Sequence, residues 1–114
     1  MQVFFLEIVT KDVDAVCKTY ETTHGVKFGE PVAAFGNAKT ASMFGGGKVS
    51  VRAPLRETEE PIVRPYWLVT DIHAAVAAAE KSGGMIAHPP LEIPDQGTFA
   101  IYILAGIEHG LWEK

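Results

Sequence analysis

One short pattern of residues occurs twice in this chain, and the repetition restricts the folds open to it. The segment VTKDVDAV, Val9–Val16, returns as VTDIHAAV, Val69–Val76, with one residue deleted. Each copy ends a run typical of a β-strand and opens a run typical of an α-helix, which then reaches glycine, at Gly25 and at Gly83. Because this junction recurs 60 residues later in a chain of 114, we expect two copies of one supersecondary unit.

Each half begins with a predicted strand that runs into a predicted helix. Strands are expected over residues 2–9 and 64–70, where apolar, β-branched and aromatic residues are frequent. The helices follow with apolar residues at the spacing i, i+3, i+4 and i+7. An aspartate stands at the expected N-cap of each helix, Asp12 in the first half and Asp71 in the second.

Three shorter strands are expected after each helix, near 27–35, 38–44 and 48–53 in the first half and near 85–88, 98–104 and 107–113 in the second. The polar, proline-bracketed segment 54–62 is the expected exposed linker. The sequence thus predicts a single α+β domain over 1–114, built from two βαβββ repeats at about 1–53 and 63–114. One helix covers one face of each small sheet, so we expect the two mixed sheets to curl around a shared cleft.

Composition and charge argue against several kinds of partner. A net charge of −4 disfavours binding to nucleic acid or to an anionic membrane surface. No apolar run approaches the roughly 18 residues of a membrane-spanning helix, and the N-terminus lacks a signal-peptide pattern. The single Cys17 cannot form an internal disulfide, so the cytoplasm is the expected compartment. Cys17 also falls on the apolar stripe of the first helix, which favours a buried, inert thiol.

The order of several motifs in the second half is characteristic. Tyr66–Val76 forms a strand-to-helix turn, Pro89–Pro94 and Gly97–Ala100 form a following hairpin, and Gly110–Trp112 closes the chain. In these motifs the chain resembles the vicinal oxygen chelate superfamily, the group of glyoxalase I, bleomycin-resistance proteins and extradiol dioxygenases. The resemblance spans essentially the whole chain and implies the paired βαβββ fold, a ligand-binding cleft and a homodimer. The usual Asp-Pro of the family's closing loop is missing, and we expect Gly106 to keep that turn.

Enzymes of this superfamily hold a divalent metal with a His or Gln on the first strand of a half and a Glu on its last. Carried over by position, the first-strand ligands fall on Phe5 and near Arg64, and the last-strand ligands on Gly110 and near Val51 or Arg52. Phenylalanine and glycine offer no ligand atom, and arginine is a permanent cation. No two of the four histidines have metal-ligand spacing. The sequence therefore predicts neither a metal nor another cofactor.

Aromatic and charged side chains are expected to line the cleft. Because side chains alternate along a strand, those predicted to face inward are Phe5, Glu7, Arg52, Arg64, Tyr66, Leu68, Glu108 and Trp112. Aromatic walls with a few convergent charges are typical of a small-molecule site, and they favour a flat or charged organic ligand. The facing of four further residues, Met43, Phe44, Phe99 and Tyr102, is left open.

These residues also have alternative roles in packing and charge pairing. The aromatic side chains could simply fill a core. Glu7 and Glu108 could form a carboxylate pair that binds a cation or shares a proton, or Glu7 could be neutralised by Arg52 or Arg64.

Three functions remain open at this point. The first is a metal-independent small-molecule-binding protein of the glyoxalase and bleomycin-resistance type. The second is a metal-independent lyase or isomerase, in which Glu7 or Glu108 acts as the base and an arginine stabilises an enolate-like charge. The third is an accessory subunit with a closed core.

Overall fold

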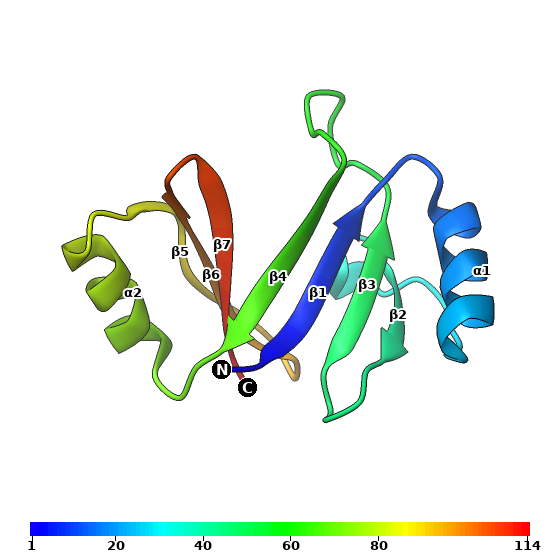
Figure 1. Cartoon of the computed structure of the whole chain (residues 1–114), viewed down its shortest axis with the longest axis horizontal. Helices are drawn as coiled ribbons and strands as arrows, with labels where there is room; N and C mark the ends of the chain where they lie inside the picture. Colours follow the sequence, from blue (N-terminus) through cyan, green and yellow to red (C-terminus); the bar gives the residue numbers. More distant parts are fainter. The chain divides into compact units, whose positions relative to one another are not determined.

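The computed structural model describes all 114 residues, which form two compact units (Figure 1). Unit 1 comprises Met1–Phe5 and Arg64–Lys114, and unit 2 comprises Leu6–Val63. The first strand, β1 (Val3–Val9), contributes residues to both units. Each unit combines one α-helix with several strands, so the α+β class expected from the sequence is confirmed. Neither α-helix has the length and apolar character needed to cross a membrane.

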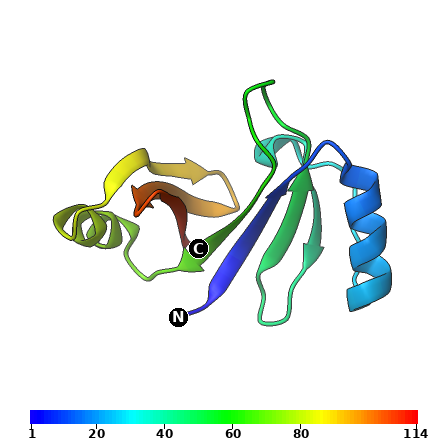
Figure 2. The same cartoon turned by 45° about the horizontal axis from the view of Figure 1, so that its top comes forward.

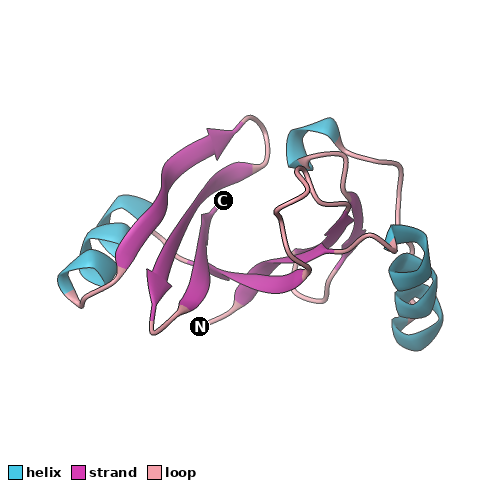
Figure 3. Ribbon diagram, turned by 90° about the horizontal axis from the view of Figure 1, so that it is seen from above, coloured by secondary structure: helices cyan, strands magenta, loops and turns pink.

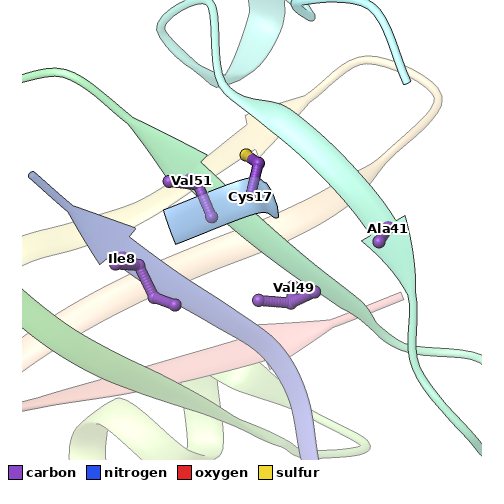
Figure 4. Close-up of a cluster of buried hydrophobic side chains, with 5 residues drawn as sticks. All are labelled: Ile8, Cys17, Ala41, Val49 and Val51. Carbon is purple, nitrogen blue, oxygen red and sulfur yellow. The ribbon is translucent and has the colours of Figure 1, made fainter. Parts of the chain in front are cut away.

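Unit 2 packs one helix against strands in the order β2-β3-β1. Its other elements are α1 (Val13–His24), η1 (Ala33–Phe35), β2 (Lys39–Ser42) and β3 (Lys48–Arg52). Strands β2 and β3 form an antiparallel hairpin. The core between helix and strands is formed by small and aliphatic side chains, shown in Figure 4: Ile8, Cys17, Ala41, Val49 and Val51. These side chains are close-packed, so α1 covers this face of the strands.

The strand expected near 27–35 does not form. The Phe28 amide donates to Glu21 Oε2 at 2.9 Å, and Val32 makes only an isolated bridge with Ala38. Pro31 has no amide hydrogen to donate to a ladder, and Gly36 takes a left-handed conformation at φ 68° that ends η1. The first half therefore has one strand fewer than predicted.

Unit 1 packs its helix against strands in the order β1-β4-β7-β6-β5. Only the first residues of β1, up to Phe5, belong to this unit. Its other elements are β4 (Ile62–Leu68), α2 (Ile72–Lys81), β5 (Met85–Ile93), β6 (Gly97–Leu104) and β7 (Ile107–Glu113). Strands β4 and β7 are parallel, whereas β6 is antiparallel to both β7 and β5. Figure 3 shows α2 beside the strands of its unit. Ile72, Ala100 and Leu111 are the buried core beneath this helix.

Strand β5 is longer than the sequence suggested, because it continues through Pro89 and Pro90 to Ile93. Prolines are tolerated here since β5 is the outermost strand and needs no second row of amide donors. The register shifts on both sides of His88, which relieves the pairing around the prolines. His88 thus lies within a strand.

The ends of the elements follow the predicted chemistry in most places. Gly25 ends α1 in a left-handed conformation, φ 67°, and Asp71 caps α2 by accepting from the Ala74 amide at 3.0 Å. The closing turn has Ala105 and Gly106 both at positive φ, so the turn is kept without the family's usual residues. The predicted curling of two sheets around a shared cleft stays a prediction.

Candidate functional site

Rows of side chains cross the face of unit 1 that lies opposite α2. Ala100, Leu111 and Tyr102 pack beneath the helix, so their neighbours along each strand point to the other face. Strand pairing sets three rows there. They are Arg64, Glu108, Ile103 and Met85; Tyr66, Gly110, Ile101 and His88; and Leu68, Trp112, Phe99 and Leu91.

Aromatic side chains fill the centre of this face. Phe5 stacks on Trp112 with ring centroids 4.7 Å apart and an interplanar angle of 4°, and Tyr66 meets Phe5 edge-on at 5.6 Å. Phe99 meets Tyr66 edge-on at 6.1 Å and contacts His88 at 4.7 Å. Phe5, Tyr66 and Trp112 are buried. These three rings therefore pack on one another, as the core-filling alternative expected, and Phe5 covers one face of Trp112.

The outer part of the same face remains accessible. Phe99, Ile101 and Ile103 are half-buried, and Met85 and Leu91 are exposed. The packed aromatic rings are thus continuous with an apolar surface on β6 and β5.

A buried arginine stands at one end of these rows. Arg64 donates from Nε and Nη2 to Glu108 Oε1 at 2.9 and 2.6 Å. Arg64 is buried, whereas the Glu108 side chain is 38% exposed. The carboxyl group is therefore both paired with the guanidinium and reachable by a solute.

Unit 2 holds a second buried arginine on the face opposite α1. Arg52 donates from Nε to Glu7 Oε2 at 2.9 Å, and from Nη1 and Nη2 to the two carboxylate oxygens of Glu59 at 2.8 Å each. The fork formed with Glu59 raises the pKa of Arg52 above its ordinary value, although burial acts in the opposite direction. The guanidinium stays charged at any ordinary pH.

Glu59 was missed by sequence reasoning, because it lies in the segment expected to be an exposed linker. Figure 2 shows this segment, residues 54–62, as a loop that stands out beyond the end of β3. The Glu59 side chain is only 15% exposed. The signal in the sequence was the acidic run of Glu57, Glu59 and Glu60 close behind Arg52, but nothing in it indicates which of the three carboxylates turns inward.

Ser50 is a further buried polar residue in unit 2. It lies two residues before Arg52 on the same face of β3, since Val49 and Val51 point to α1. Ser50 is 1% exposed, and its Oγ has no hydrogen-bond partner within the protein.

The predicted site residues thus divide between the two units. Phe5, Arg64, Tyr66, Leu68, Glu108 and Trp112 share one face of unit 1. Glu7 and Arg52 lie together in unit 2, which is the neutralised pairing expected as an alternative for Glu7.

The structure also resolves the facing of the residues left open. Phe99 lies on the candidate face and Tyr102 beneath α2, whereas Met43 packs against the α1 core and Phe44 is fully exposed. Cys17 is buried, and desolvation raises the pKa of its thiol, as fits an inert core residue.

No protein-family model matches the chain, and no curated protein matches its sequence. Solved structures are similar over almost its full length, each at 16% identity. A hypothetical protein, BH1468, from Bacillus halodurans C-125 has a TM-score of 0.76, with 99% of this chain and 94% of that chain covered. A variant of Streptomyces coelicolor methylmalonyl-CoA epimerase in complex with 2-nitronate-propionyl-CoA has a TM-score of 0.73, with 100% and 97% covered. The methylmalonyl-CoA epimerase from Mycobacterium tuberculosis has a TM-score of 0.72, with 97% and 86% covered.

The chain has the fold of these structures, the paired βαβββ or vicinal oxygen chelate fold. At such low identity the likeness concerns the fold alone, and the residues must be judged by their own chemistry.

The metal-ligand positions that the sequence analysis carried over onto this chain are occupied by residues that pack or form ion pairs. Phe5 stacks on Trp112, and Arg64 is held by Glu108. A Cβ atom at Gly110 would lie 2.5 Å from Cδ2 of Tyr66, so the Tyr66 ring occupies the space of any side chain there. A phenyl ring, a guanidinium and a glycine do not suit a divalent metal. Within neither unit do three or more His, Cys, Asp or Glu side chains gather where they could hold a metal ion.

Proposed function

We propose that the protein binds a small organic ligand, in the manner of the glyoxalase and bleomycin-resistance type, without a metal. The observation that carries the proposal is a buried arginine with glutamate partners on the sheet face opposite each helix. Burying an ion pair costs desolvation free energy that an apolar core would avoid, so such pairs are weak evidence for stability alone. Polar groups placed beside apolar, aromatic surface are instead typical of ligand sites.

The proposed ligand has an apolar, flat body and at least one charged or polar group. Its body would lie on the accessible side chains Phe99, Ile101 and Ile103, with the packed rings beneath. Within the same unit, its polar group would reach Arg64 or its partner Glu108. The ligand-contacting residues proposed are those predicted from the sequence, taken unit by unit: Phe5, Arg64, Tyr66, Leu68, Glu108 and Trp112 in unit 1, and Glu7 and Arg52 in unit 2.

Native mass spectrometry of freshly purified protein tests this proposal. We expect a homodimer that carries an organic compound and no stoichiometric divalent metal. A divalent metal bound one per chain, and retained after gel filtration, would contradict metal-independent binding. The further expectations, a cytoplasmic location and no nucleic-acid or membrane partner, belong to the same proposal.

Proton-transfer catalysis is the second candidate, and the exposure of Glu108 favours it. The Glu108 side chain is 38% exposed beside Arg64, whereas the Glu7 side chain is 12% exposed. A general base must reach the proton it removes, and an adjacent cation stabilises the enolate that results. Methylmalonyl-CoA epimerases share this fold, so a carbon acid next to a thioester is a reasonable trial substrate.

Deuterium exchange at the α-carbon of methylmalonyl-CoA in heavy water distinguishes the two candidates. Catalysis by Glu108 predicts exchange that Glu108→Gln abolishes and Glu7→Gln retains. Exchange no faster than in buffer would favour binding alone for this class of compound.

A further inference from the structure

Two carboxylates hold the Arg52 guanidinium, and they come from very different parts of the chain. Glu7 lies within β1, whereas Glu59 lies in the 54–62 segment between β3 and β4. We propose that Arg52 is the binding site for the carboxylate group of an organic ligand, and that Glu59 occupies this site until such a ligand displaces it. The proposal rests on the proposed function, because it names the chemical class of a ligand group that unit 2 would bind.

The contact between Arg52 and Glu59 has the geometry of ligand recognition. Two parallel bonds of 2.8 Å join Nη1 and Nη2 to the two oxygens of one carboxylate, which is how arginine binds carboxylates most strongly. A ligand carboxylate in the place of Glu59 would keep both bonds and the net charge of the cluster. A phosphate dianion would add a further negative charge beside Glu7, so a carboxylate suits the site better.

The segment around Glu59 is exposed, so the Glu59 carboxylate can move away from Arg52. Residues 55–58 and 60–61 are exposed. Within the segment, the Leu55 amide donates to Glu59 Oε1 at 2.7 Å and the Glu59 amide donates to the Arg56 carbonyl at 3.1 Å. Leu55 lies beside Gly36 but is 67% exposed, so it buries little apolar surface. Apart from the Glu59 carboxylate itself, the segment therefore has few buried contacts to lose when it opens.

Ser50 supplies an independent indication of a ligand on this face. Its hydroxyl is buried, has no partner within the protein, and lies on the same face of β3 as Arg52. A buried hydroxyl without a partner is unfavourable, and an oxygen atom of a ligand would satisfy it. Glu59 fills the position of the carboxylate only, so a larger ligand would still have the Ser50 hydroxyl to bind.

The proposal is tested by NMR titration of the full chain with acetate and with benzoate at constant ionic strength. The signals followed are the Nε–H of Arg52, which donates to Glu7 on the same guanidinium that binds Glu59, and the amide of Leu55, which donates to Glu59 Oε1. In the Glu59→Gln variant the competing carboxylate is gone, and we expect both acids to bind about tenfold or more tightly than in the unmodified chain. Glu60→Gln is the matched control, because it removes the same charge from the neighbouring exposed residue. We expect its dissociation constants to equal those of the unmodified chain.

Equal dissociation constants for Glu59→Gln and Glu60→Gln would overturn the proposal, as would tighter binding of inorganic phosphate than of benzoate. Arg52→Gln should abolish the response; if that variant does not fold, the comparison of the two glutamate variants still decides. The same titration tests the proposed function separately from the Arg52 site. Benzoate that shifts the Phe99 and His88 signals equally in both variants, without moving Leu55, would exclude the Arg52 site and leave ligand binding in place.

Discussion

Gly110 gives the Tyr66 ring its place on the candidate face of unit 1. A Cβ atom at this position would lie 2.5 Å from the ring and 2.7 Å from the carbonyl oxygen of Pro65, which is backbone and cannot swing aside. The residue thus matters through the volume it leaves free for the ring, although the resemblance to the superfamily implied a metal-ligand position there. Sequence reasoning recognised that glycine cannot bind a metal but had no means of seeing what fills the space.

Gly110→Ala is expected to lower the free energy of unfolding by about 1–3 kcal/mol, because the added methyl group overpacks the site against Tyr66. Gly29→Ala is the control, since a Cβ atom there would meet nothing within 4 Å. Urea unfolding of both variants measures the difference. Equal stabilities would show that Tyr66 moves aside freely.

Cys17 gives the fold a dependence on alkaline pH. Burial raises the pKa of its thiol above the ordinary value near 9.0, so the folded state holds the proton more tightly than the unfolded state. The stability that this residue contributes is complete below pH 9 and is lost as the pH rises through its higher folded-state pKa. Denaturant unfolding from pH 8 to pH 10.5 should show a steeper loss for the unmodified chain than for Cys17→Ala. Parallel curves would contradict this assignment.

The two copies of the repeated motif end in helices whose first turns are held differently. In α2 the Asp71 side chain accepts from the Ala74 amide, and Glu113 Oε1 accepts from the Ile72 amide at 2.9 Å. In α1 the Asp12 side chain makes no capping bond, and its own amide donates to Thr10 Oγ1 instead. An aspartate at the same place in the motif therefore contributes more to the stability of α2 than to that of α1.

Asp71→Ala is expected to cost about 1 kcal/mol of stability, which is typical for the loss of an N-cap hydrogen bond. Asp12→Ala should cost distinctly less, because no side-chain bond is lost. Urea midpoints of the two variants, with unchanged m-values, measure the contrast. Equal losses would mean that Asp12 caps α1 in solution after all.

Sequence periodicity predicted helices and long strands well, because burial of one face imposes a regular spacing of apolar residues. It predicted the alternation on β1 that separates Ile8, beneath α1, from Glu7, on the opposite face. It was wrong at residues 27–35, where apolar content suggested a strand and proline and glycine prevent one. It could not find Glu59, since an ion pair made by a loop leaves no period in the sequence.

The two units of the molecule each place a helix on one face of their strands, and they differ on the opposite face. Each unit has a helix on one face and a buried arginine with glutamate partners on the other. Only unit 1 adds the stacked rings and the accessible apolar rows on β6 and β5. Both units therefore offer a buried arginine to a polar group of a ligand, and unit 1 alone also offers an accessible apolar surface.

Ile103→Ser is expected to weaken the binding of anilinonaphthalene sulfonate, a flat, apolar anion, by roughly fivefold, because about 1 kcal/mol of apolar contact is removed. Ile107→Ser is the matched control, since Ile107 is exposed and lies on the other face of the neighbouring strand. Fluorescence titration measures both dissociation constants. The same weakening in both variants would place the dye elsewhere.

The two prolines of β5 affect how copies of this chain meet. An outermost strand ordinarily offers free amide and carbonyl groups to any passing strand, which is how sheets of separate molecules join and aggregate. Pro89 and Pro90 remove two successive amide donors from this border, and the bulges around His88 break its regular line. The border at the opposite end, β2, is only four residues long and begins with Lys39. Neither border is suited to growth by strand addition, so the chain is protected against cross-β aggregation at both ends of its strand order.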